Sequence, residues 1–193
     1  MKLTSIAIFA SGTGSNAENL IRFFKNHPQI AVKLVVSNKS DAAVIQKAQN
    51  LGVETVFLPN TAFVDGQELI NLLRQHEIEW IVLAGFLRKI SPELIAHFPN
   101  HIINIHPSLL PKYGGKGMYG MHVHEAVIAA KESTSGITIH LVNEEFDKGA
   151  ILAQYTTNLS NSDTPATLAQ KIHALEHQFF PIIVEQTIQK SQP

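Results

Sequence analysis

Apolar runs and amphipathic stretches alternate along the first hundred residues of the chain. Residues 6–10, 31–36 and 80–84 are largely apolar at consecutive positions, which is typical of strands buried on both faces of a parallel sheet. Stretches such as 17–25 and 65–77 carry apolar residues three and four positions apart, which predicts helices with one buried face. This alternation of strands and helices predicts a doubly wound α/β sheet.

Capping and breaking residues mark further elements. Asp41 is expected to cap a helix that ends near Gly52, and residues 53–58 read as another strand. Ser91 followed by Pro92 is typical of the start of a short helix. These elements continue the β, α, β, α order as far as the apolar strand at the centre of the chain.

The pattern changes in the second half of the chain. Glycine-rich residues 112–120 predict a mobile loop, and residues 121–131 a helix. Two strands, 134–142 and 150–156, are joined by a short turn, which predicts antiparallel pairing. A long amphipathic helix follows from Thr164. The whole pattern predicts a Rossmann-like, mostly parallel sheet with an antiparallel C-terminal portion.

Length and composition favour a single domain that binds small molecules. A chain of 193 residues fits one domain, which we expect to span residues 1–193. With 15 basic and 16 acidic residues, it offers no general electrostatic reason to bind nucleic acid or an anionic membrane. No apolar run approaches the roughly 20 residues of a membrane span, and the N-terminal run is too short for a signal peptide. Because cysteine is also absent, we expect a cytoplasmic protein.

A glycine-rich segment, residues 11–16, joins the first strand to the first helix. Its glycines allow backbone N–H groups to converge, and the helix N-terminus adds a partial positive charge, which suits a phosphate. Gly12, Gly14 and Ala17 match the dinucleotide-binding pattern, but residues 37–39 at the end of the next strand include no acidic residue for a ribose hydroxyl. The sequence therefore favours a phosphate monoester over a dinucleotide, with an ordinary glycine turn as the alternative.

Asn104 and His106 lie two residues apart at the end of an apolar strand, so their side chains leave the same side of the backbone. Pro107 then breaks the chain into a loop, at the edge where α/β sheets bind ligands. Asp147 lies in the turn between the two antiparallel strands. A capping Asn, a structural His and an ordinary turn Asp are the alternatives to a functional site.

Polar residues on two helices need separate explanations. His122 and His124 are two apart on a predicted helix and point in different directions, so we expect no shared metal ion. His173 and Glu176 have no packing reason to be on the final helix.

Four motifs together resemble the phosphoribosylglycinamide formyltransferases, a folate-dependent family of purine synthesis. They occur in the family's order, at residues 11–16, 83–88, 104–111 and 140–149. The likeness runs from about Lys2 to the final helix. Methionyl-tRNA formyltransferases and formyltetrahydrofolate deformylases look similar but carry additional domains, which we do not expect in 193 residues.

The resemblance implies transfer of a formyl group from 10-formyltetrahydrofolate to the primary amine of glycinamide ribonucleotide, without a metal. It implies that Asn104 and His106 stabilise the oxyanion and that Asp147 relays protons. The residues expected to hold the phosphate and ribose of the ribonucleotide are Gly14, Ser15, Asn16 and Glu176. The residues expected to hold the folate are Leu87, Arg88, Lys89, Ile90, Val142 and Asn143.

Two other functions stay open, a hydrolase similar to formyltetrahydrofolate deformylase and a dinucleotide-binding protein that transfers no group. The chain departs from the family pattern in a longer loop at 114–121 and at Leu87 and His173, where Met and a Gln- or Lys-like residue are more usual. We expect a monomer or a homodimer.

Overall fold

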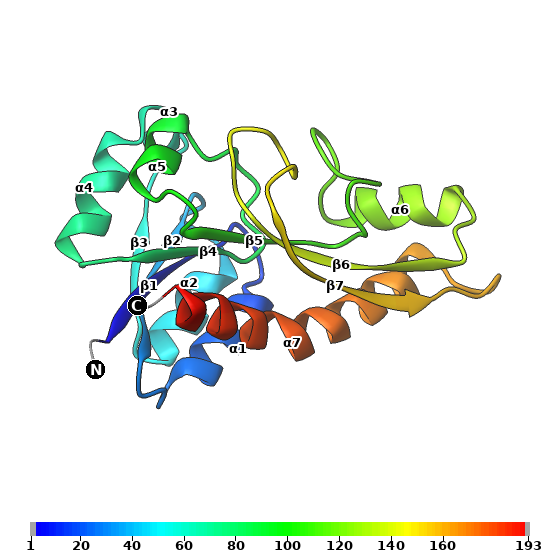
Figure 1. Ribbon diagram of the computed structural model, residues 1–193, viewed down its shortest axis with the longest axis horizontal. Helices are drawn as coiled ribbons and strands as arrows, with labels where there is room; N and C mark the ends of the chain where they lie inside the picture. Colours follow the sequence, from blue (N-terminus) through cyan, green and yellow to red (C-terminus); the bar gives the residue numbers. More distant parts are fainter. Residues whose placement is uncertain (1–2, 192–193) are drawn as a thin grey trace.

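Seven strands form one sheet in the computed structural model of the chain, which describes residues 3–191 (Figure 1). The strands are β1 (Thr4–Phe9), β2 (Ile30–Ser37), β3 (Glu54–Phe57), β4 (Trp80–Leu83), β5 (Ile102–His106), β6 (Thr134–Leu141) and β7 (Ile151–Asn158). Their order is β3-β2-β1-β4-β5-β6-β7. The first five strands pair in parallel, whereas β6 pairs antiparallel with both β5 and β7. The predicted fold class is confirmed.

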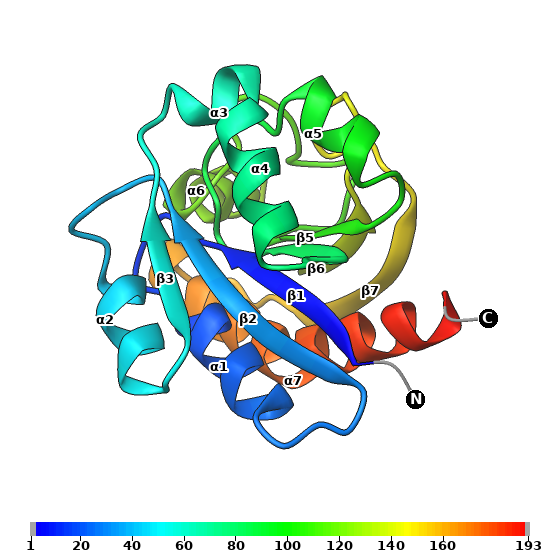
Figure 2. The same cartoon turned by 90° about the vertical axis from the view of Figure 1, so that its left-hand side faces the viewer.

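Helices cover both faces of the sheet (Figure 2). One face carries α1 (Ser15–Phe24), α2 (Ala43–Asn50) and α7 (Pro165–Lys190), and the other carries α3 (Ala62–Asp65), α4 (Gln67–Gln75) and α5 (Pro92–His97). The remaining helix, α6 (Met121–Ala129), contributes to the same core as α1 and α7. Because successive strand residues face opposite sides, Ile8 packs into one core and Phe9 into the other. Within the described residues, no helix is both long enough and apolar enough to cross a membrane.

The helix predicted over residues 65–77 is confirmed as α4, but it begins two residues later, because Gly66 at its N-cap has a left-handed φ of 72° and separates it from α3. One prediction about helices is wrong. Asp41 does not cap α2, because the N-cap position falls one residue later, on Ala42, and no side chain caps this helix. By contrast, Ser91 caps α5 as predicted, and its side chain accepts a backbone N–H of the first turn.

The strands β1 and β4 lie side by side at the centre of the sheet, and the chain winds outward from them in opposite directions. This reversal opens a crevice at the carboxyl ends of the strands. Ser11, two residues after β1, hydrogen-bonds to both the loop after β2 and the loop after β4. Its Oγ donates to Asn38 Oδ1 at 2.6 Å and accepts the backbone N–H of Leu87 at 3.0 Å. The fold thus fixes the loop after β4 at the crevice.

Candidate functional site

Asn104 on β5 lies directly opposite His140 on β6, so the two side chains share one face of the sheet. Asn104 Nδ2 is 3.1 Å from His140 Nε2. His140 Nδ1 lies 2.8 Å from the carbonyl oxygen of Leu141, which only accepts, so Nδ1 carries the proton and Nε2 accepts. Asn104 therefore donates one amide N–H to His140. This bond fixes the orientation of the amide and directs its other N–H elsewhere.

Burial lowers the pKa of His140, because an imidazolium loses its hydration inside the sheet. The Leu141 carbonyl and the Asp147 carboxylate act in the opposite direction but are weaker. The neutral form that burial favours is the form that accepts the hydrogen bond from Asn104. The pKa of His140 and the orientation of Asn104 are therefore linked.

This linkage predicts an acid-sensitive fold. Since the pKa of His140 falls below its ordinary value of 6.5 on folding, the unfolded chain binds a proton more readily. The free energy of unfolding should stay constant above pH 6.5 and decrease as the pH is lowered below this value. In His140→Gln, which keeps an amide oxygen to accept from Asn104, the decline measured by urea unfolding should be shallower. The exposed His122→Gln variant should match the unmodified chain, and an equally steep decline in His140→Gln would contradict the assignment.

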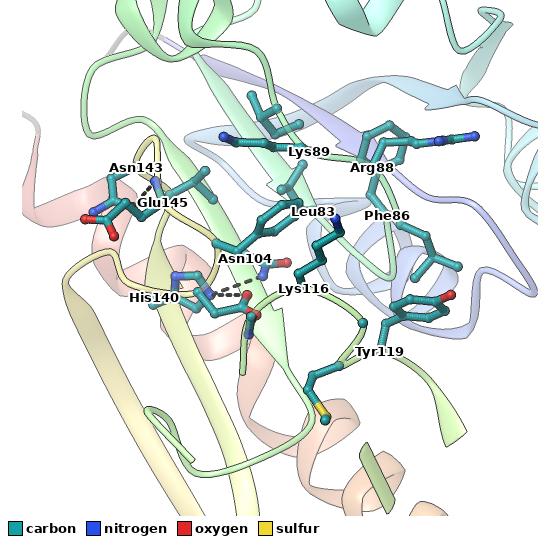
Figure 3. Close-up of a pocket in the computed structure, with 18 residues that line it drawn as sticks. Leu83, Phe86, Arg88, Lys89, Asn104, Lys116, Tyr119, His140, Asn143 and Glu145 are labelled. Atoms are coloured by element: carbon teal, nitrogen blue, oxygen red, sulfur yellow. Dashed lines mark hydrogen bonds and ion pairs between the residues drawn. The ribbon is translucent and has the colours of Figure 1, made fainter. Parts of the chain in front are cut away.

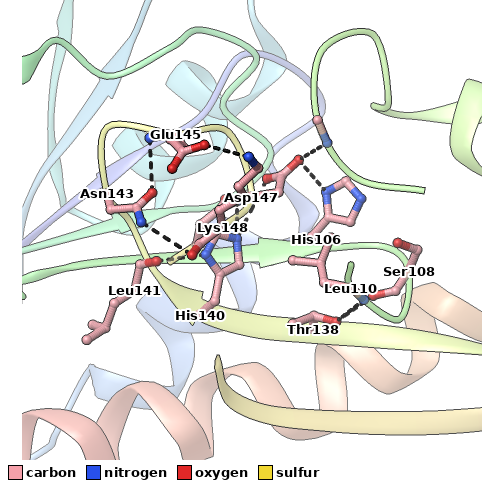
Figure 4. A network of polar contacts seen from close by, with 12 residues as sticks. His106, Ser108, Leu110, Thr138, His140, Leu141, Asn143, Glu145, Asp147 and Lys148 are labelled. Atoms are coloured by element: carbon pink, nitrogen blue, oxygen red, sulfur yellow. Dashed lines mark hydrogen bonds and ion pairs between the residues drawn. The ribbon is translucent and has the colours of Figure 1, made fainter. Parts of the chain in front are cut away.

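Asp147 lies between two imidazole rings (Figure 4). Its Oδ2 is 3.6 Å from His106 Nδ1, and its Oδ1 is 3.7 Å from His140 Nε2. The backbone N–H of Gly115 donates to Oδ2 at 2.8 Å. Asp147 itself has a left-handed φ of 54°, which Asp adopts more readily than most residues. The turn before β7 therefore folds back over β5 and presents this carboxylate to His106.

His106 is 4% exposed, and both of its ring nitrogens face polar groups. Its Nε2 lies 2.8 Å from the carbonyl oxygen of Tyr113. Because a carbonyl only accepts, Nε2 carries a proton. The other nitrogen, Nδ1, is the one turned to Asp147. His106 is therefore held in a defined orientation, with Nδ1 as the nitrogen available for chemistry.

An apolar cavity of about 230 Å³ opens beside these residues (Figure 3). Its walls come from the loop after β4, the turn after β6 and the glycine-rich loop before α6. All six residues expected to hold the folate line it, namely Leu87, Arg88, Lys89, Ile90, Val142 and Asn143. Asn104, His140 and Asp147 also line this cavity.

A second, more polar cavity of about 280 Å³ adjoins the first. Asn16 and Glu176 line it together with His106. Asn16 Nδ2 donates to Glu176 Oε2 at 2.8 Å, whereas Asn16 Oδ1 is buried with no hydrogen-bond partner among the described residues. Burial raises the pKa of Glu176, and the bond from Asn16 and the nearby His173 oppose this rise. The polar cavity thus offers one unsatisfied acceptor and one buried carboxyl group.

Gly14 and Ser15 lie beside the polar cavity without lining it. Gly14 precedes α1 with a left-handed φ of 72°, and a Cβ there would come within 2.5 Å of the Val44 side chain. No side chain caps α1, so the first backbone N–H groups of this helix are available to an anion. Glycine at position 14 is therefore required by the close approach of α2, independently of any ligand.

The two cavities share four lining residues, Phe86, Asn104, Tyr119 and Asp147. A ligand in the apolar cavity and a ligand in the polar cavity would meet beside Asn104, His106 and Asp147. The arrangement therefore suits transfer of a group between two molecules, with hydrogen-bond donors and a carboxylate at the meeting point.

Sequence reasoning gave no role to several residues of this site. His140 belongs to a recognised motif, but its pairing with Asn104 depends on a register between strands distant in sequence. His124 lines the polar cavity, and burial together with the nearby His106 lowers its pKa. Lys116 and Tyr119 reach the apolar cavity from a loop whose composition indicated only mobility.

Among residues 3–191, no cluster of three or more His, Asp or Glu side chains is arranged to hold a metal ion. His122 is exposed and His124 is buried, so the two histidines of α6 do point in different directions.

The fold and the paired cavities define an α/β protein with a two-ligand site at the carboxyl edge of its sheet. A family model described as formyl transferase matches residues 4–184, and the chain belongs to this family. It is 39% identical to the chloroplastic phosphoribosylglycinamide formyltransferase of Arabidopsis thaliana, over 93% of this chain and 63% of the plant protein. It therefore spans less than two thirds of that relative.

Two bacterial proteins match over nearly their whole length. The phosphoribosylglycinamide formyltransferase of Bacillus subtilis is 37% identical, over 96% of this chain and 95% of that protein. The crystal structure of the enzyme of this name from Bacillus halodurans has a TM-score of 0.88 at 33% identity, and covers 98% of this chain and 97% of its own. The resemblance found in the sequence is confirmed.

Proposed function

We propose that this protein transfers the formyl group of 10-formyltetrahydrofolate to the primary amine of glycinamide ribonucleotide, in purine synthesis. The observation that carries this proposal is the meeting of an apolar and a polar cavity at Asn104 and Asp147. Relatives named for this activity support the choice of substrates. The products are formylglycinamide ribonucleotide and tetrahydrofolate.

The two substrates take different cavities. The pterin ring and its linker occupy the apolar cavity, where backbone groups of residues 87–90 and 142–143 meet the heterocycle. The ribonucleotide occupies the polar cavity, with Glu176 accepting ribose hydroxyl groups and the phosphate at the N-terminus of α1 near Gly14, Ser15 and Asn16. The reacting amine and formyl carbon then lie beside Asn104.

Negative charge develops on the formyl oxygen when the amine attacks the carbon, and the site supplies donors for it. Asn104 has one N–H committed to His140, so its other N–H is the donor that reaches the oxygen. His106 contributes Nδ1–H when this nitrogen is protonated. The bonds to His140 and Tyr113 hold both donors in place before the substrates arrive.

Protons must leave the attacking amine and reach N10 of the folate as the C–N10 bond breaks. Asp147 is placed for this relay, because its Oδ2 lies beside His106 Nδ1, across 3.6 Å. Across this distance the proton passes either through a water molecule or after a small movement of one of the two side chains. The carboxylate also attracts the positive charge that His106 bears during transfer.

We also infer the setting of the reaction. One catalytic domain spans residues 1–193, works in the cytoplasm as a monomer or a homodimer, and uses neither nucleic acid, a membrane nor a metal. The balanced charge supports small-molecule substrates rather than nucleic acid or a membrane, and the single continuous sheet supports one domain.

An assay with both substrates tests the proposed function. The protein is mixed with 10-formyltetrahydrofolate and glycinamide ribonucleotide, and absorbance of the folate is followed. We expect turnover that depends on the ribonucleotide. Equal turnover without the ribonucleotide would favour the deformylase-like hydrolase, and quenching of NADH fluorescence with no turnover would favour a dinucleotide-binding protein.

The Asn16→Ala variant tests the polar cavity. We expect its KM for the ribonucleotide to rise about tenfold, with the KM for the folate unchanged, because only the polar cavity loses a group. Asn19→Ala is the matched control, since Asn19 lies on the same helix and donates instead to the backbone of His177. An unchanged KM for the ribonucleotide in Asn16→Ala would remove this assignment.

A further inference from the structure

The backbone carbonyl that holds His106 belongs to Tyr113, whose conformation is unusual. Tyr113 has a left-handed φ of 55°, which is unfavourable for a bulky aromatic residue. Such a conformation persists when surrounding contacts fix it. The position of this carbonyl, and with it the 2.8 Å contact to His106 Nε2, therefore depends on what holds Tyr113.

The Tyr113 side chain is anchored by a residue that lines neither of the two cavities. Its Oη donates to Glu132 Oε1 at 2.8 Å, in the turn between α6 and β6. Lys112 Nζ donates to the same oxygen at 2.9 Å. Burial raises the pKa of Tyr113, so the phenol stays protonated and continues to donate. Neither Tyr113 nor Glu132 lines the apolar or the polar cavity.

A second set of contacts holds the start of the same segment (Figure 4). Thr138 Oγ1 donates to the Ser108 carbonyl at 2.7 Å and accepts the Leu110 N–H at 3.0 Å. Ser108 Oγ donates to the Lys112 carbonyl at 2.8 Å. The same hydroxyl also lies 3.4 Å from the Tyr113 carbonyl oxygen. These bonds fix the chain up to Lys112 and restrain the Tyr113 carbonyl from one side, whereas the contact with Glu132 restrains Tyr113 through its side chain.

We propose that the hydrogen bond between Tyr113 and Glu132 positions His106 for catalysis. It places the Tyr113 carbonyl, which keeps the proton on Nε2 and turns Nδ1 toward Asp147. Tyr113 and Glu132 are thus positioning residues that act through His106. The kinetic consequence rests on the proposed function, whereas the protonation of His106 does not.

Kinetics of single and double variants test this contact. Tyr113→Phe and Glu132→Ala should each lower kcat about tenfold at unchanged KM, less than the hundredfold that a 1 Å misplacement can cost. The double variant should be no slower than either single variant, because both remove the same contact. Glu132→Gln retains an acceptor and should keep kcat within about twofold. Lys112→Met removes the other partner of Glu132 but leaves its bond with Tyr113 intact. As the matched control, it should keep the kcat of the unmodified protein.

The protonation state of His106, read by ¹⁵N NMR of its imidazole, separates this inference from the proposed function. We expect the Nε2–H tautomer in the unmodified protein and a mixture of tautomers in Tyr113→Phe, with the His106→Gln spectrum giving the assignment. A tautomer unchanged in Tyr113→Phe would overturn the inference, as would losses of kcat that multiply in the double variant. If the protein transfers no formyl group, the NMR result still decides whether Tyr113 positions His106.

Discussion

Replacing Asp147 with Asn is expected to lower kcat about 10²- to 10⁴-fold, the range in which a positioned proton-transfer group contributes. The amide keeps the size of the carboxylate and an oxygen to accept the Gly115 N–H, so the turn should stay in place. What is lost is the charge beside His106 and His140 and the ability to take up a proton. Steady-state kinetics should show the change in kcat, with both KM values altered far less.

Glu144→Gln is the control for this variant, because Glu144 is an exposed carboxylate in the same turn and lines neither cavity. It should retain the kcat of the unmodified protein. Thermal unfolding of Asp147→Asn should confirm that the fold is intact. A kcat within a factor of about three of the unmodified protein would contradict the role of Asp147.

Replacing Asn104 with Ala is expected to lower kcat about 10²- to 10³-fold, or ~2.7 to 4 kcal/mol in the barrier, as for other oxyanion donors. The loss follows because the N–H that reaches the formyl oxygen is absent. The same change leaves His140 Nε2 buried without its donor, which should cost about 1 to 3 kcal/mol in the free energy of unfolding. Kinetics and urea unfolding measure these two effects separately.

The effects of Asn104→Ala on kcat and on the free energy of unfolding are distinguished by the choice of assay temperature and by a control variant. Assays well below the unfolding midpoint exclude loss of folded protein as the cause of a lower kcat. Asn50→Ala, at an exposed position on α2, should change neither quantity. An Asn104→Ala enzyme with normal kcat would show that Asn104 supports the sheet and does not stabilise the transition state.

Local patterns predicted most of the fold, because most of its helices and strands can be recognised from residues close together in sequence. The buried central strands are apolar throughout, and the change to antiparallel pairing follows from the short turn between β6 and β7. The start of α4 was predicted two residues too early because Gly66 reads as an ordinary residue within an amphipathic stretch, although its positive φ separates α3 from α4. Asp41 was wrongly predicted to cap α2 because the exact N-cap position depends on backbone geometry, and sequence patterns locate helix ends only to within one or two residues.

The site was predictable in part for a similar reason. The spacing of Asn104 and His106 places both at one strand end, and strand geometry alone brings them together. The partners that orient them lie far away in sequence, since His140 pairs across the β5–β6 register and Tyr113 acts through its backbone. No local pattern reports that a carbonyl group will face a particular imidazole nitrogen. Such contacts follow from tertiary structure.

Isotope labelling of the transferred group tests the central claim most directly. The protein is given 10-formyltetrahydrofolate labelled with ¹³C in the formyl group, with glycinamide ribonucleotide in excess, and the label is followed by NMR. Direct transfer predicts that the label appears in the formamide of the product, in amounts equal to the folate consumed, and that Asp147→Asn slows this step. Release of the label as formate while the ribonucleotide remains unformylated would contradict the proposed transfer.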